Sequence, residues 1–141
     1  MTSPCVLHVL PSRRDERGAL AFAETGKQLA FEVRREFHLF DLRAGVARGG
    51  HAHRACHQFL IAMAGSFRVT TDDGEKKLEW ELGSPDQGLH VPPGHWVELT
   101  PRSPSAVLSV LASHAYDEAD YIRSRDVFSS HTTQLAAKRP A

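Results

Sequence analysis

The sequence predicts an all-β fold, either a sandwich or a closed barrel, on three observations. Short segments rich in apolar residues recur along the chain, and turns containing glycine, proline and aspartate separate them. Prolines oppose a helical interpretation of the middle of the chain, at Pro85, Pro92, Pro93, Pro101 and Pro104. One segment, residues 116–130, suits a helix, with acidic residues near its start and arginines later.

The length of 141 residues suits one domain, which we assign to residues 1–129. We expect residues 130–141 to form a mobile C-terminal tail, because they carry no apolar stripe that a core would bury.

The N-terminal third is predicted to alternate between extended segments and turns. CVLHVL at residues 5–10 is a short strand candidate, and PSRRDERG at residues 11–18 is a polar turn. ALAFAE at residues 19–24 alternates weakly between apolar and polar positions. LAFEVRREFHLFDL at residues 29–42 is a longer extended run, which AGVARGG at residues 44–50 interrupts.

The centre of the chain shows clearer strand signals. HQFLIAMAGSFRVTT at residues 57–71 is predicted to be two strands joined near Gly65. DDG at residues 72–74 is a hairpin signal, and KKLEWEL at residues 76–82 alternates as a half-buried strand does. The segments LHV, HWVEL and AVLSVLA are further strand candidates, at residues 89–91, 95–99 and 106–112.

Composition argues against several classes of function. The 17 Lys and Arg residues balance 17 Asp and Glu residues, so the chain lacks the basic field of a nucleic-acid-binding protein. The N-terminal apolar run of six residues is too short for a signal peptide, and a spanning helix needs about 20 apolar residues. Cys5 and Cys56 make neither a disulfide framework nor a structural zinc site. We therefore expect a cytoplasmic protein with no membrane and no nucleic-acid partner.

The stretch ARGGHAHRACHQF, residues 47–59, carries the strongest functional signal. On a strand, His51 and His53 point to the same face because side chains alternate with a period of two. Paired imidazoles can bind a metal or transfer protons near neutral pH, and the spacing leaves both open. A lone strand histidine is usually a half-buried structural residue, but this pair beside a Gly-Gly break is harder to explain in that way.

The spacing of Gly45, His51, His53, Gln58 and Gly65 resembles the first motif of the cupins. Metal-binding cupins place a glutamate where this chain has Gln58, whose neutral amide is a weaker ligand for a divalent ion.

The second cupin motif is only partly present, in VPPGHWVEL at residues 91–99. The histidine that metal cupins supply is expected at position 96 or 97, which here are Trp96 and Val97. His95 lies one or two positions early, and a shift of one residue on a strand reverses the face. Two of four ligands remain, so we expect no catalytic metal.

Three longer stretches together resemble the sugar-nucleotide 3,4-ketoisomerases, over roughly residues 15–128: RGGHAHRACHQFLIAMAGSFRVTTDDG, SPDQGLHVPPGHWVEL and VLASHAYDEADYIRSRDVF. These cupins act on dTDP-4-keto-6-deoxyglucose in deoxysugar biosynthesis. The resemblance implies an RmlC-like jelly-roll β-barrel with a short C-terminal helical segment and a homodimer. It also implies catalysis by His51 and His53 with no metal and no cofactor.

The implied reaction moves a carbonyl from C4 to C3 of the sugar. A base removes the C3 proton, an enediolate forms, and a proton returns to C4. His51 and His53 are the candidates for base and proton source, and the sequence leaves open which is which. The candidates for substrate binding are Arg48, Arg35, Arg17, Gln58, His95 and Trp96.

Other functions stay open at this point. They are a metal-dependent cupin enzyme, a sugar-nucleotide epimerase, and a cupin that binds a ligand without catalysis. The gluco or galacto configuration of the 3-keto product also stays open, because FHLFD at residues 37–41 lacks tyrosines that many of these ketoisomerases carry.

Overall fold

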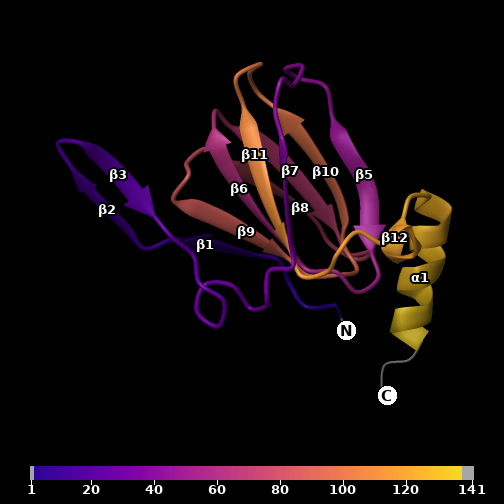
Figure 1. Ribbon diagram of the computed structural model, residues 1–141. Helices are drawn as coiled ribbons and strands as arrows, with labels where there is room; N and C mark the ends of the chain where they lie inside the picture. Colours follow the sequence, from indigo (N-terminus) through magenta and orange to yellow (C-terminus); the bar gives the residue numbers. More distant parts are fainter. Residues whose placement is uncertain (1, 138–141) are drawn as a thin grey trace.

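The structure is a computed structural model, and it describes residues 2–137. Short strands dominate it, and one α-helix lies near the C-terminus (Figure 1). The strands are β1 (Val6–Val9), β2 (Ser12–Asp15), β3 (Gly18–Ala21), β4 (Arg35–Leu39), β5 (Arg48–His53), β6 (Gln58–Ala64), β7 (Phe67–Asp72), β8 (Lys77–Leu82), β9 (Gln87–Val91), β10 (Trp96–Pro101), β11 (Val107–Ala112) and β12 (Tyr121–Ile122). A 3₁₀ turn at Glu118–Asp120 precedes β12, and helix α1 spans Arg125–Ala137.

The strands form two antiparallel five-stranded sheets and a separate hairpin. The first sheet has the order β1-β9-β6-β11-β4, the second has the order β12-β5-β10-β7-β8, and β2 pairs only with β3. No strand ladder joins the two large sheets among residues 2–137, so they face each other as an open jelly-roll sandwich. The all-β prediction is confirmed.

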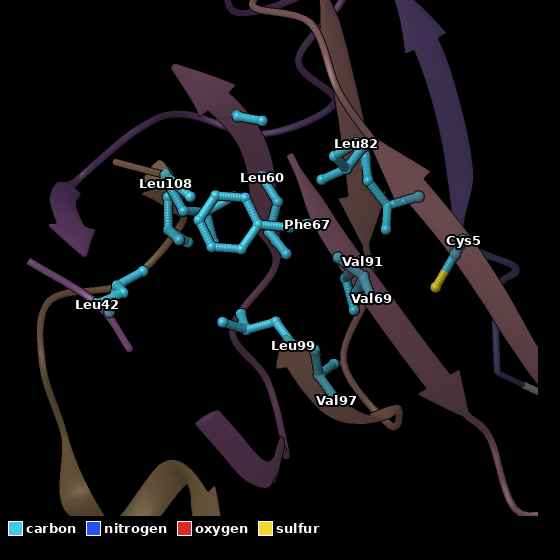
Figure 2. Packing of buried hydrophobic residues seen from close by; sticks show 14 residues of the cluster. Cys5, Leu42, Leu60, Phe67, Val69, Leu82, Val91, Val97, Leu99 and Leu108 are labelled. Carbon is cyan, nitrogen blue, oxygen red and sulfur yellow. The ribbon is translucent and has the colours of Figure 1, made fainter. Parts of the chain in front are cut away.

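Inward-facing side chains from both sheets make one core between them (Figure 2). Leu60 and Leu108 come from the first sheet, and Phe67, Val69 and Leu99 come from the second. Alternation sets which residues these are: in β11 every second side chain is buried. The core therefore packs the two sheets against each other, and some of its residues, such as Leu60 and Leu99, also face the cavity between them.

A second, smaller core lies on the outer face of the second sheet, where α1 packs. It consists of Ala52, Trp96, Ile122 and Phe128. Because strand side chains alternate, each outward residue directs its chain neighbours inward. This small core thus orients the inner face on which the candidate site is built.

The structure confirms the predicted turn near Gly65 and the hairpin after Asp72, since β6, β7 and β8 follow one another there. Residues 12–15, predicted to be a turn, instead form β2 and pair with β3. The turn is confined to Glu16–Arg17, and Gly18 adopts a φ of 139° that suits glycine. Polar residues such as Arg13 are compatible with this ladder because the hairpin is exposed on both faces.

The helix lies further along the chain than the sequence predicted. Asp117 caps the 3₁₀ turn by accepting from the Ala119 N–H, and Tyr121–Ile122 then pairs with β5, so the α-helix begins only at Arg125. Residues 130–137, which we assigned to a mobile tail, continue this helix, and residues 138–141 lie outside the described residues. Neither helical segment in residues 2–137 has the length and apolarity needed to cross a membrane.

Candidate active site

Strand β5 lies between two partners, and both help to place its histidines. On one side His51 is paired with Val97 of β10, and on the other side His53 is paired with Tyr121 of β12. Gly49 allows the approach to β10, because a Cβ there would lie 2.8 Å from the Val97 carbonyl oxygen. Its φ of 93° also suits glycine. The glycine-rich start of β5 is thus a requirement of the backbone around the histidines.

The inward side of β5 borders a cavity of about 200 Å³ between the two sheets. Apolar side chains make most of its wall, namely Phe37, Leu39, Leu60, Val97, Leu99 and Val110. Polar side chains gather on the remainder, namely Arg48, His51, Gln58, Tyr121 and Arg123. An apolar pocket with a few convergent polar groups is typical of a small-molecule site.

The two histidines and Tyr121 form a compact aromatic group. The ring centroids of His51 and His53 are 5.2 Å apart, with planes almost perpendicular. The Tyr121 ring lies 5.1 Å from His51 and 4.4 Å from His53. The predicted shared orientation of the two histidines is therefore present, and Tyr121 restricts the movement of both rings.

His53 is buried and bound to a carboxylate from a distant part of the chain. Its Nδ1 lies 2.8 Å from Oδ2 of Asp120, the residue just before β12. The carboxylate also accepts backbone N–H groups of the loop after β5, from Ala55 at 2.7 Å and Cys56 at 3.3 Å. Asp120 therefore ties His53 to the loop that leads into β6.

Two buried polar atoms among the described residues have no hydrogen-bond partner: Nε of Arg35 and Nε2 of His53. They belong to neighbouring side chains, since the charge of Arg35 helps to lower the pKa of His53. The Arg35 guanidinium also lies over the rings of Phe37 and Tyr116, at 5.3 and 5.7 Å. An unpaired buried polar group costs about 1–3 kcal/mol, so two together indicate a place where a polar ligand binds.

An arginine network forms the rim beside β12. Glu118 accepts two hydrogen bonds from Arg123, at 2.6 and 2.9 Å, and one from the Tyr116 hydroxyl at 2.6 Å. The Arg123 guanidinium also lies 4.4 Å from the centre of the Tyr121 ring. With Arg48 on the cavity wall, this network gives the site two cationic groups that suit an anionic ligand.

Burial keeps both histidines uncharged at neutral pH. It lowers the pKa of His51 to about 4, with further contributions from His53 and Arg123. Burial also lowers the pKa of His53, although the hydrogen bond and charge of Asp120 oppose the shift. Two neutral imidazoles can accept protons at pH 7, as a proton-transfer site requires.

Several sequence candidates meet in this site. Arg48, His51 and Gln58 line the cavity, His53 lies beside His51, and Arg35 lies near His53. The other three candidates lie elsewhere in the structure.

Arg17, His95 and Trp96 do not line the cavity. Arg17 lies in the exposed β2–β3 turn, where its side chain pairs with Asp15 at 2.7 Å. The buried His95 ring donates from Nδ1 to the Pro92 carbonyl, 3.0 Å away, within the turn before β10. Trp96 faces outward into the small core under α1, because its neighbour Val97 occupies the inward position.

Asp120, Tyr121 and Arg123 were not among the residues that the sequence predicted for the site. All three lie in the segment YDEADYIR, residues 116–123, which the sequence analysis placed at the start of a predicted helix. Two consecutive β-forming residues, Tyr121 and Ile122, were the available sign of a short strand.

One group of possible metal ligands occurs among residues 2–137. His53, Cys56 and Asp120 each place a donor atom within 4.8 Å of the others. The His53 and Asp120 atoms bind each other, and the Cys56 thiol lies 3.3 Å from the His57 carbonyl. The group also differs from the cupin ligand set. One position of that set corresponds to Val97 in this chain, whose apolar side chain cannot bind a metal. The donor set is explained without an ion.

The family described as "FdtA: WxcM-like, C-terminal" matches residues 3–133.

The chain belongs to this family.

Relatives with known names agree with the resemblance predicted from the sequence. The TDP-4-oxo-6-deoxy-α-D-glucose-3,4-oxoisomerase of Aneurinibacillus thermoaerophilus is 40% identical over 121 residues, which cover 86% of this chain and 87% of that protein. The solved TDP-quinovose 3,4-ketoisomerase WlaRB of Campylobacter jejuni is 39% identical with a TM-score of 0.85, over 89% of this chain and 97% of that chain.

A third relative was solved with a sugar nucleotide. It is a histidine-to-asparagine mutant of the 3,4-ketoisomerase QdtA from Thermoanaerobacterium thermosaccharolyticum, in complex with TDP-4-keto-6-deoxyglucose. It is 29% identical with a TM-score of 0.90, over 95% of this chain and 97% of that chain. The jelly-roll fold of this FdtA-like chain is therefore the fold of solved 3,4-ketoisomerases.

The burial of His51 predicts how acid affects this protein. In the unfolded chain His51 titrates near 6.5, but in the folded chain its pKa is about 4. Acid therefore adds a proton to the unfolded form first, and the free energy of unfolding should fall as the pH falls from 6.5 toward 4. A His51→Asn variant should lose part of this dependence in urea denaturation. Histidine NMR should show His51 titrating well below 6, and a midpoint near 6.5 would contradict its burial.

Proposed function

We propose that this chain is a 3,4-ketoisomerase that converts dTDP-4-keto-6-deoxyglucose into a dTDP-3-keto-6-deoxyhexose in deoxysugar biosynthesis. The observation that carries the proposal is the pair of neutral histidines on the inward face of β5, beside a cavity with two arginines. The 3,4-oxoisomerase at 40% identity supports the same reaction.

The reaction is a proton rearrangement that suits this site. The C4 ketone acidifies the C3 hydrogen, and one neutral imidazole takes it as a proton while the electron pair forms an enediolate. A proton then bonds to C4, and the proton of the C3 hydroxyl is relayed to the C4 oxygen as the C3 carbonyl forms. No atom is gained or lost and no external oxidant takes part, so His51 and His53 supply the acid–base chemistry.

The remaining polar groups suit the other parts of the substrate. Arg48 and Arg123 offer guanidinium groups for the diphosphate, and the Glu118 carboxylate holds Arg123 at the rim until a ligand binds. The Gln58 amide offers both a donor and an acceptor to the sugar hydroxyls. The unpartnered Nε of Arg35 offers a charged donor to an enediolate oxygen.

We also propose that catalysis needs no metal or other cofactor, because a tautomerisation requires only acid–base groups and stabilisation of the enediolate. Gln58 and Val97 support this, since neither offers a strong ligand at the two remaining cupin positions.

We propose a cytoplasmic homodimer. Both free cysteines, Cys5 and Cys56, are buried thiols, which fits a reducing compartment. The β2–β3 hairpin extends away from the two large sheets (Figure 1) and joins neither of them. An isolated hairpin is only marginally stable in water, and this one is fully exposed and carries Leu20 at 58% exposure. Contact with a second copy would stabilise it.

The reaction predicts a specific product. Incubation of the protein with dTDP-4-keto-6-deoxyglucose should give a 3-keto sugar by NMR, and in deuterated water deuterium should enter at C4. The His51→Asn variant should turn over about 10²–10⁴-fold more slowly with little change in melting temperature, because it loses a general acid–base group. A product that keeps its ketone at C4 would indicate an epimerase, and bound sugar without exchange would indicate a non-catalytic protein. Either result contradicts the proposal.

The role of Arg48 predicts a binding defect. Arg48→Ala should raise the KM for the sugar nucleotide by about 10–100-fold, because a charge-assisted hydrogen bond contributes roughly 1.5–3 kcal/mol. Arg68→Ala is the matched control, since Arg68 is exposed on β7 and lies 3.9 Å from Glu81 outside the cavity. Steady-state kinetics of both variants checks this, and equal KM values would remove Arg48 from the binding site.

The homodimer predicts a particle of twice the chain mass of 15.6 kDa in light scattering. Leu20→Asp should shift the equilibrium toward the monomer, because it places a charge on the apolar surface of the hairpin. Glu75→Lys changes charge in the distant β7–β8 turn and should leave the mass unchanged. A wild-type mass of one chain at micromolar concentration would contradict the dimer.

A further inference from the structure

We propose that Asp120 is a positioning residue for the ketoisomerase reaction, because its carboxylate holds His53 in the tautomer that carries hydrogen on Nδ1 and leaves Nε2 to accept a proton. The inference rests on the proposed function and adds to it an assignment of the two histidines: His53 is the base that attacks the C3 hydrogen.

The carboxylate of Asp120 is held in place from several sides. Oδ1 accepts the Ala55 N–H at 2.7 Å, and Oδ2 accepts the Cys56 N–H at 3.3 Å. The backbone carbonyl of Asp120 accepts the Arg54 N–H at 2.9 Å. Three consecutive backbone donors after β5 therefore fix this residue beside His53, and its side chain has little freedom to turn away.

Hydrogen-bond chemistry then sets the protons on His53. Burial alone would raise the pKa of Asp120, but hydrogen bonds from His53, Ala55 and Cys56 outweigh it and lower that pKa. The carboxylate is therefore ionised at neutral pH and can only accept. Since Nδ1 of His53 lies 2.8 Å from Oδ2, Nδ1 must carry the hydrogen, and Nε2 of the neutral ring has a free electron pair.

The free nitrogen lies beside the cavity, since His51 lines the cavity and the centroid of the His53 ring lies 5.2 Å from that of His51. His53 is only 5% exposed, and its Nε2 has no hydrogen-bond partner. The charged and titratable groups that face His53 are Asp120 and Tyr121 from the 3₁₀ turn and β12, Arg123 after them, Arg35 on β4, His51 on β5 and Cys56 in the following loop. Among them, Asp120 is the carboxylate in direct contact, so it is the group that stabilises a protonated His53.

The proton step balances with this arrangement. The C3–H bond breaks, its electron pair enters the enediolate, and its proton forms a bond to Nε2. The resulting imidazolium keeps its Nδ1–H bond to the Asp120 carboxylate. His51 has no carboxylate bound to its ring in the structure, and burial holds its pKa near 4, so His51 suits the relay between the oxygens as a neutral donor and acceptor.

Asp120→Asn tests the tautomer while preserving the shape of the side chain. The Ala55 N–H can only donate, so in the variant the amide oxygen should take the position of Oδ1 beside it. The NH₂ group then takes the position of Oδ2 and faces Nδ1 of His53. An NH₂ group can only donate there, so the hydrogen of His53 should move to Nε2 and block the proton-accepting atom. Asp117→Asn is the matched control, because it caps the same 3₁₀ turn and does not touch His53.

The deciding experiment is ¹⁵N NMR of labelled histidines near pH 7. Wild-type and Asp117→Asn proteins should show His53 protonated on Nδ1, and Asp120→Asn should show it protonated on Nε2. A wild-type His53 that carries its hydrogen on Nε2 would overturn the inference. This measurement does not need the variant to fold, since the wild-type protein alone decides it.

Kinetics gives the second readout. Asp120→Asn should lower kcat by about 10²–10⁴-fold with a nearly constant KM, as expected for a group that acts in proton transfer rather than binding. Because Asp120 opposes the lowering of the His53 pKa, the acidic limb of the variant's rate profile should move to lower pH. A kcat equal to that of Asp117→Asn, or an unchanged acidic limb, would overturn the inference. If the wild-type protein forms no 3-keto sugar, the proposed function fails, whereas the NMR result still decides the tautomer separately.

Discussion

The pairing of β12 with β5 is the interaction on which the candidate site depends. Only two residue pairs make it, Tyr121 with His53 and Ile122 with Ala52. It brings together segments about 70 residues apart in the chain and places the carboxylate of Asp120 against the His53 ring. Without it, β5 would keep its histidines, but His53 would lose its carboxylate, and Tyr121 and Arg123 would leave the cavity wall.

The same pairing explains why a helix lies outside the sheet. Ile122 faces outward and is covered by Phe128 of α1 together with Trp96. Since the side-chain period of a strand is two, burial of Ile122 on the outer face fixes Tyr121 on the inner face, and a shift of one residue would exchange them. The small apolar core under α1 therefore sets the register of the inner face that carries the candidate site, although none of its residues lines the cavity.

The parts of the site that could be predicted are those encoded locally. His51 and His53 are two positions apart, so any strand presents them together, and the position of Arg48 followed from the same segment. Asp120 could not be predicted, because its contact depends on a strand pairing across 67 residues. Trp96 was predicted as a candidate for substrate binding, but alternation alone does not say which of Trp96 and Val97 faces inward. The helix was placed too early because the acidic residues of a capped 3₁₀ turn resemble the first turn of an α-helix.

The environment makes two identical side chains unequal, and this inequality is what a proton shuttle needs. Both histidines lose water, which disfavours the charged form of each. Only His53 has a carboxylate within hydrogen-bond distance, so a proton that enters the site costs less on His53 than on His51. Two histidines in equal environments would have equal affinities for the proton. In this pair, His53 can carry a positive charge beside Asp120, whereas His51 stays neutral. Because the proposed reaction begins and ends with the same number of protons, a base that holds its proton only transiently is sufficient. If His53 has the role proposed for it, the burial that lowers its pKa favours returning that proton to the sugar.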